Sequence, residues 1–131
     1  MKRIVLCGSR KLKEQIIELG INIEKRGFEV VIPKEFFTPM GKKEHSMLHF
    51  SEIQNPKTDY VLIVNDEKNG IPNYIGANSF AELAFGFYFG KKVFLKNDIY
   101  KPYEDEITGW GVIPLKGDIN KMLNYKEERK Q

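Results

Sequence analysis

The segment from Gly76 to Gly86 contains the residues best suited to chemistry. If this segment is helical, one face carries small and polar side chains at three- and four-residue spacing: Asn78, Ser79, Glu82 and Gly86. A glutamate carboxylate can act as a nucleophile, and the helix N-terminus beside it favours an anionic ligand. The spacing of Ser79 and Glu82 also fits a capping box, in which Glu82 accepts a hydrogen bond from the Ser79 N–H. Two roles are therefore open for Glu82, nucleophile or helix cap.

The tripeptide Gly8-Ser9-Arg10 directly follows the first apolar run of the chain. Backbone N–H groups, the Ser9 hydroxyl and the Arg10 guanidinium can converge there on an anion such as a phosphate. The same tripeptide also suits an ordinary tight turn with a serine N-cap. The chain has neither the GxGxxG of a dinucleotide site nor the Gly-Lys-Ser/Thr of a P-loop, which argues against conventional NAD or ATP binding.

A third group of polar residues flanks the most continuous apolar run of the chain and the loop after it: His45, His49, Asn65, Asp66 and Tyr74. Each also has a purely structural interpretation, because Asp66 can begin a turn and a histidine beside an aromatic residue can be half-buried. Their expected convergence on one edge of the molecule favours a site.

The elements that position these residues follow from five short apolar runs that alternate with segments of helical periodicity. Strands are expected over residues 4–7, 28–32, 60–64, 93–95 and 112–115. Helices are expected around 12–23, over 43–53, over about 79–89 and from near 118. The run 60–64 is the most continuous, which predicts a central strand buried on both faces. The loop 65–76 is long for a simple connection, and such loops in a compact domain are usually functional or disordered.

The inward faces of two helices can be predicted from the apolar spacing. In the segment 43–53, Met47, Phe50 and Ile53 are spaced to face the sheet. In the later helix a buried stripe is expected from Phe80, Leu83, Ala84 and Phe87. Glu82 lies off this stripe, so we expect it to point into a crevice.

The alternation predicts one α/β domain over residues 1–131, a flavodoxin-like (Rossmann-like) three-layer sandwich with a five-stranded, mainly parallel sheet. In this architecture ligands bind at the carboxyl ends of the strands. The loops after the first, third and fourth strands should therefore form the site.

Composition excludes several other classes. The net charge of +3 is dispersed rather than clustered, and the mixed tail 126–130 is expected to be a solvated helix end, so nucleic-acid binding gains no support. No apolar run approaches the roughly 20 residues of a membrane span, and no signal peptide is evident, so a cytoplasmic protein without a membrane partner is expected. Cys7 is the only cysteine, and no Cys/His cluster has zinc spacing, so neither a disulfide nor a metal is expected.

Four stretches together resemble one enzyme superfamily: the strand ending in Gly8-Ser9, the run from Asp59 to Asn65, the segment from Tyr74 to Gly86, and Gly90-Lys91-Lys92-Val93. They are similar to motifs of nucleoside 2-deoxyribosyltransferases and 2′-deoxynucleoside 5′-phosphate N-hydrolases, over residues 1 to about 97. The most specific piece is the small-residue turn followed by a glutamate, further small residues and Gly-Lys before a strand. The resemblance implies an enzyme that cleaves or exchanges the N-glycosidic bond of a deoxynucleoside or its monophosphate.

The resemblance also assigns roles to individual residues. The family's glutamate, which attacks the anomeric carbon of deoxyribose, falls on Glu82, and the phosphate contacts fall on Ser9, Arg10 and Ser79. Family members carry an aspartate on the helix before the central strand, where this sequence has His49. His49 or Asp66 is therefore expected to protonate the leaving base. Further ligand contacts are expected at Gly8, Asn65, Tyr74, Gly76 and Asn78.

The expected chemistry passes through an oxocarbenium-like state that a carboxylate can trap, and it requires neither a metal ion nor a redox cofactor. A two-fold homodimer is expected, because Phe85, Tyr88 and Phe89 add apolar surface beyond the stripe needed for the sheet, and because the resembling family associates in this way. Two other classes stay open. One is a non-catalytic sensor of a nucleotide-derived ligand, and the other is a flavodoxin-like electron carrier, for which Ser9-Arg10-Lys11 is a poor phosphate loop.

Overall fold

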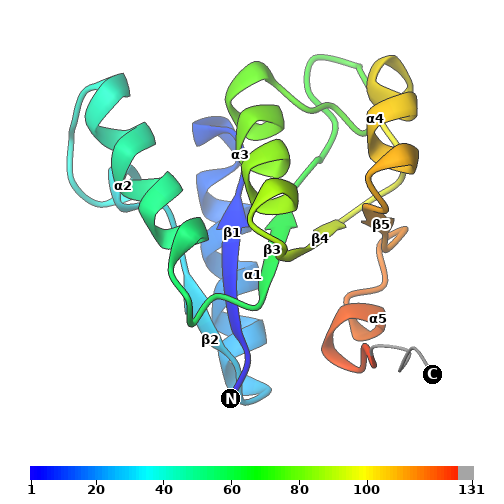
Figure 1. Cartoon of the computed structure of the whole chain (residues 1–131). Helices are drawn as coiled ribbons and strands as arrows, with labels where there is room; N and C mark the ends of the chain where they lie inside the picture. Colours follow the sequence, from blue (N-terminus) through cyan, green and yellow to red (C-terminus); the bar gives the residue numbers. More distant parts are fainter. Residues whose placement is uncertain (127–131) are drawn as a thin grey trace.

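In the computed structural model, which describes residues 1–126, five strands form one sheet in the order β2-β1-β3-β4-β5 (Figure 1). The strands are β1 (Arg3–Cys7), β2 (Glu29–Val31), β3 (Tyr60–Ile63), β4 (Lys92–Leu95) and β5 (Ile113–Pro114). Every neighbouring pair is parallel, with β3 in the centre. The predicted flavodoxin-like sandwich and its central strand are confirmed.

Helices cover both faces of the sheet, so the molecule has three layers. They are α1 (Lys13–Lys25), α2 (Lys42–Gln54), α3 (Ala77–Tyr88), α4 (Glu104–Gly109) and α5 (Asn120–Leu123). One core cluster joins Ile16 and Ile23 of α1 and Met122 of α5 to one face of the sheet. The other joins Ile53, Leu83 and Ile107, from α2, α3 and α4, to the opposite face. Along β1 and β3 the side chains alternate between these two clusters, which is why both strands are apolar throughout.

Helix α3 lies unusually close to the sheet because Gly86 has no side chain. A Cβ atom at this position would lie 3.0 Å from Cγ2 of Val61 and 3.3 Å from Cγ2 of Val93. The close approach buries the whole face of α3 that carries Gly86, including Ser79 and Glu82. The burial of Glu82 therefore depends on Gly86, which lies one turn further along the same helix.

Two predicted helix faces need correction. On α2, Met47 is 63% exposed, whereas His45, His49 and Ile53 are buried at four-residue spacing. On α3, Phe87 is 42% exposed and Phe80 only half-buried, while the polar face packs on the sheet. In both helices polar side chains occupy part of the buried face. Because the prediction assumed that only apolar residues face the core, it assigned these two faces wrongly.

Other differences concern element boundaries. Helix α3 begins at Ala77 rather than near Ser79, and the segment around Pro102 contains a 3₁₀ turn, Lys101–Tyr103, followed by α4, where a plain loop was expected. The expected tail helix end at 126–130 lies outside the described residues except for Lys126. Among the described helices, none combines the length and apolarity needed to cross a membrane.

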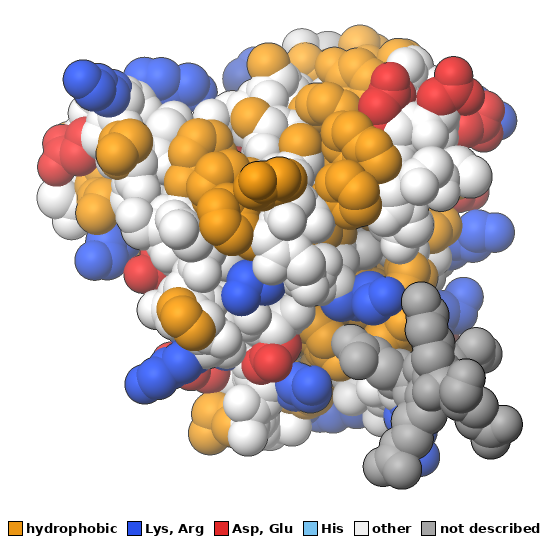
Figure 2. All heavy atoms as spheres, viewed as in Figure 1, with side chains coloured by type: hydrophobic (Ala, Val, Ile, Leu, Met, Phe, Trp, Pro, Cys, Tyr) orange, Lys and Arg blue, Asp and Glu red, His pale blue; other side chains and the backbone are white. Residues whose placement is uncertain are grey.

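Hydrophobic side chains gather on the side of the molecule that carries α2 and α3 (Figure 2). The exposed members include Met47 on α2, Phe87 and Tyr88 on α3, and Phe89 at its C-terminal end. Tyr88 is 80% exposed, which is unusual for a large aromatic side chain beside other exposed apolar residues.

Candidate functional site

A pocket of about 790 Å³ opens at the carboxyl edge of the sheet, between the loop after β1 and the start of α3. This is where β1 and β3 lead to helices on opposite faces, the position at which open α/β sheets bind ligands. Most of the predicted ligand contacts line it: Gly8, Ser9, Arg10, Asp66, Tyr74, Gly76, Asn78 and Ser79.

The walls of this pocket carry four basic and three acidic side chains. Arg10, Lys11 and Lys42 line it together with Lys68, and the acidic lining residues are Glu35, Asp66 and Glu67. The first turn of α3 adds backbone N–H groups, because its N-cap, Gly76, contributes no side-chain hydrogen bond. Such a helix start favours an anion.

The capping alternative for Glu82 is wrong. The helix begins at Ala77, so Ser79 lies inside the first turn and is not the N-cap. Within residues 1–126 no hydrogen bond joins the Glu82 carboxyl to the Ser79 N–H. For Ser9, in contrast, the turn interpretation holds, since its hydroxyl accepts a hydrogen bond of 3.2 Å from the Lys11 N–H at the start of a short 3₁₀ helix.

Arg10 stands at the rim of the pocket, with its side chain 67% exposed. Its Nη2 donates a hydrogen bond of 2.8 Å to Oε2 of Glu35. The other oxygen of Glu35 lies 3.3 Å from Nε2 of His45, which is buried on α2. Glu35 thus connects the exposed guanidinium to the buried histidines, since the His45 ring stacks on the His49 ring.

Asn65 is fully buried and has a structural role, which corrects its predicted role as a ligand contact. Its amide nitrogen donates to the carbonyls of Asp98 (2.8 Å) and Asn73 (3.4 Å), and its Oδ1 accepts from the Asn97 N–H at 2.9 Å. These bonds tie the long loop after β3 to the loop after β4.

Asp66, the next residue, does line the pocket. Its carboxylate accepts hydrogen bonds from Nζ of Lys96 at 2.9 and 3.0 Å and from the Asn97 side chain at 2.8 Å. Tyr74 lies on the opposite part of the same loop, with Nζ of Lys68 5.2 Å from the centre of its ring. Both side chains are held by neighbours yet touch the space that a ligand would occupy.

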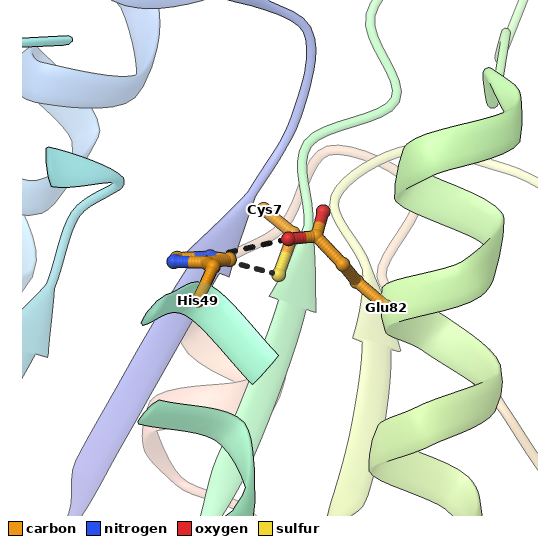
Figure 3. A group of neighbouring side chains, drawn as sticks. All are labelled: Cys7, His49 and Glu82. Atoms are coloured by element: carbon orange, nitrogen blue, oxygen red, sulfur yellow. Dashed lines mark hydrogen bonds and ion pairs between the residues drawn. The ribbon is translucent and has the colours of Figure 1, made fainter. Parts of the chain in front are cut away.

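Beneath the pocket, Cys7, His49 and Glu82 form a buried cluster (Figure 3). They come from the end of β1, from α2 and from α3, and each is at most 3% exposed. Nε2 of His49 lies 3.4 Å from Sγ of Cys7 and 3.7 Å from Oε2 of Glu82. The same nitrogen lies 2.9 Å from the Leu6 carbonyl, to which it can donate its proton.

The three side chains of the cluster are neutral at pH 7. Burial raises the pKa of Glu82 to about 8, with a further contribution from the charge of Glu35, while Lys42 opposes the shift. Burial also lowers the pKa of His49 to about 4 and raises that of Cys7 well above its usual value. The contact of 3.7 Å between His49 and Glu82 is therefore not an ion pair, and Oε2 of Glu82 has no hydrogen-bond partner within residues 1–126.

Neither Glu82 nor His49 belongs to the described lining of the pocket. Ser79 does, and it lies one turn before Glu82 on the same helix face. In Figure 3 one oxygen of Glu82 is directed at His49, and the other points toward the carboxyl end of β3, where the pocket opens. Glu82, which was expected to point into the crevice, thus lies below the floor of the pocket rather than on its wall.

Several residues of the site were not predicted from the sequence, among them Cys7, Glu35 and Lys42. Cys7 ends a strand at the expected ligand edge, and this position was a usable signal. Glu35 lies between β2 and α2, and Lys42 is the first residue of α2; no sequence pattern marks a contact of either with the first loop.

No protein-family model matches the chain, and a search of curated proteins found no match. The side chains of the pocket and of the cluster beneath it therefore carry the functional assignment.

Proposed function

We propose that the protein binds a deoxynucleoside, preferably as its monophosphate, and cleaves or exchanges its N-glycosidic bond with Glu82. One observation supports this most directly. A pocket of about 790 Å³, lined by Arg10, Lys11 and the first turn of α3, lies at the ligand edge of the fold, and the same helix carries the buried carboxyl group of Glu82 one turn further on.

The phosphate is assigned to the end of the pocket where Arg10, Lys11 and the first turn of α3 meet. Charged hydrogen bonds from a guanidinium and the partial positive charge of a helix start both favour a dianion over a neutral group. Sugar and base then extend toward Tyr74 and Asp66. The volume is within the usual range for sites of small organic ligands.

In the proposed reaction, a carboxylate oxygen of Glu82 forms a bond to the anomeric carbon as the bond from that carbon to the base breaks. The electron pair of the broken bond leaves with the base, which takes up a proton. Of the two predicted proton donors only Asp66 lines the pocket. Its carboxylate accepts hydrogen bonds from Lys96 and Asn97, so a water molecule beside it supplies the proton to the base. Water or a second base then attacks the same carbon and releases Glu82.

His49 has a different place in this scheme from the one predicted. It contacts Glu82 at 3.7 Å and is only 3% exposed, so it can position the carboxyl group but cannot reach a leaving base in the pocket. Because His49 is neutral, it does not stabilise the Glu82 carboxylate by charge, and only the more weakly acting Lys42 does so. Glu82 consequently becomes nucleophilic only as the pH approaches its pKa of about 8.

A second function is favoured by the same burial. Glu82 is only 2% exposed and is not among the residues that line the pocket, as expected for a non-catalytic module that binds a nucleotide-derived ligand in a retained crevice. The two functions share the pocket and differ only in whether a sugar reaches Glu82.

Chromatography of free base after incubation with a panel of deoxynucleosides and their monophosphates tests the proposal. We expect base release that increases with pH up to about 8. Glu82→Gln should lower turnover by several orders of magnitude and retain ligand binding, because an amide cannot form the covalent intermediate. Glu67→Gln, which removes one acid of the pocket lining and leaves Glu82 intact, is the matched control and should remain active.

The possible results separate the hypotheses. Ligand binding without base release identifies the binding module. Base release by Glu82→Gln at the wild-type rate rules out Glu82 as the nucleophile, and absence of binding to any member of the panel refutes both functions.

A further inference from the structure

The buried cluster contains three different metal-ligating atoms at short range. Sγ of Cys7, a ring nitrogen of His49 and a carboxylate oxygen of Glu82 all lie within 4.8 Å of one another. Because they come from β1, α2 and α3, the packing of a helix pair on the sheet brings them together (Figure 3).

A second observation points to a ligand at the same place. Oε2 of Glu82 is buried, is directed at His49 and has no hydrogen-bond partner in the described chain. A buried oxygen without a partner is costly to a fold, and native structures normally satisfy such atoms with protein, water or an ion. This one points at the two other candidate ligands.

The spacing fits a tetrahedral ion. With metal bonds of about 2.0 Å to nitrogen and oxygen and about 2.3 Å to sulfur, tetrahedral geometry separates neighbouring ligand atoms by about 3.3 to 3.6 Å. The observed separations are 3.4 Å from Nε2 to Sγ and 3.7 Å from Nε2 to Oε2. The remaining separation, from Sγ to an oxygen of Glu82, is no more than 4.8 Å, so small movements of these side chains would complete three positions of a coordination sphere.

The geometry points to Cys7, His49 and Glu82 as a binding site for a zinc-like divalent cation. Thiolate and imidazole ligands favour zinc and its neighbours in the first transition row over magnesium or calcium. A thiolate and a carboxylate together balance the two charges of the ion, so the occupied site is neutral overall and suited to a buried position.

Binding requires three local changes that balance in protons. The Cys7 thiol and the Glu82 carboxyl group each release one proton to solvent as they bond to the ion. His49 keeps its proton but carries it on Nδ1, so that the Nε2 lone pair faces the ion in place of the hydrogen bond to Leu6. The Leu6 carbonyl oxygen, 2.9 Å from Nε2, or a water molecule can take the fourth position.

This site goes beyond the proposed function and places a constraint on it. A carboxylate bonded to an ion is not available to attack a sugar, so occupancy by zinc switches off the proposed N-glycosidase. The site itself needs no nucleotide and can be tested in its absence.

The test uses full-length protein without a histidine tag, stripped with a chelator and titrated with Co²⁺ as a spectroscopic probe. We expect one equivalent to give the near-ultraviolet charge-transfer band of a cobalt–thiolate bond and the intense visible bands of a four-coordinate ion. Zn²⁺ should then displace Co²⁺ and raise the melting temperature.

Two variants and a matched control locate the ion. Cys7→Ser should abolish the charge-transfer band, and His49→Gln should weaken binding by at least tenfold. His45→Gln replaces a second buried histidine one turn away, which stacks on His49 but directs its Nε2 at Glu35 and supplies none of the three ligand atoms. This variant should bind Co²⁺ as the wild type does. Folding of each variant is checked by circular dichroism, and the wild-type titration decides the outcome even where a variant fails to fold.

Absence of stoichiometric binding to the wild type, or a six-coordinate spectrum without the thiolate band, overturns the proposal. Loss of Co²⁺ binding in His45→Gln together with wild-type binding in His49→Gln also overturns it. None of these results depends on base release, so failure of the metal site and failure of the proposed enzyme remain distinguishable.

Discussion

Replacing Glu82 by glutamine should remove a specific part of the pH dependence of stability. Unfolding brings the pKa of Glu82 from about 8 back to its ordinary value of 4.5. Between these values the folded state holds a proton that the unfolded state has lost, so the free energy of unfolding falls as the pH rises. The contribution is fully present below pH 4.5 and is lost as the pH approaches 8.

His49 acts in the opposite direction at lower pH. Its pKa of about 4 in the fold lies below the ordinary 6.5, so its contribution is present above pH 6.5 and is lost as the pH falls toward 4. The pKa of His45 is also lowered by burial, which reinforces this trend. From pH 4.5 to 6.5 the effects of Glu82 and His49 offset one another, and only the Glu82 effect remains above pH 6.5.

The magnitude follows from linkage at about 1.4 kcal/mol per pH unit for one proton. From pH 6.5 to 8 the wild type should lose on the order of 2 kcal/mol of unfolding free energy. In Glu82→Gln this slope should disappear, because the amide has the shape of the protonated acid and does not titrate. The amide donors can shift the absolute stability, so the slope is the quantity to compare.

Urea denaturation at half-unit steps from pH 5 to 8, with a chelator present to exclude metal ions, measures the slope. Glu18→Gln, an exposed substitution on α1, is the control and should follow the wild type. If wild type and Glu82→Gln lose stability equally above pH 6.5, Glu82 is not a buried neutral acid and the electrostatic description of the cluster is wrong.

Three further predictions concern the pocket, the packing and the assembly. Arg10→Ala should weaken binding of a deoxynucleoside monophosphate by about 1.5 to 3 kcal/mol, the range for a charged hydrogen bond, and leave nucleoside binding unchanged in calorimetry. Gly86→Ala should cost about 1 to 3 kcal/mol in denaturant unfolding, because its Cβ would press on Val61 and lift α3; wild-type stability would refute the close packing. Light scattering should give a dimer mass at micromolar concentration, and Tyr88→Lys should give a monomer, since a charge on the exposed apolar face opposes self-association; a monomeric wild type contradicts this.

The sheet was predictable because its strands are short apolar runs, and such a run indicates a strand without knowledge of its tertiary contacts. Tyr60–Ile63 is buried on both faces, and the sequence signal for such a strand is strong. Parallel order follows from the alternation with helices, so the edge that carries the site follows as well. Eight of the 17 residues that line the pocket, such as Ser9, Tyr74 and Ser79, were predictable for this reason.

The buried cluster was not predictable, because burial of polar groups contradicts the rule by which helix faces are read. Met47 has the spacing of a core residue on α2, yet histidines occupy that face. The cause lies in tertiary structure, since Gly86 lets α3 approach the sheet and enclose Glu82 against His49. Asn65 was misassigned for a related reason, because its type suits a ligand contact and a loop anchor equally well.

The anchoring of the loops by Asn65 has a kinetic consequence. Because its side chain joins the loop after β3 to the loop after β4, the rim that carries Asp66 and Tyr74 is braced before any ligand arrives. A ligand entering such a preorganised site need not order a flexible lid, and less of its binding free energy is lost to conformational entropy. For the proposed nucleotide ligand we therefore expect a one-step association whose rate is governed by diffusion and by the attraction of Arg10 and Lys11 for the phosphate.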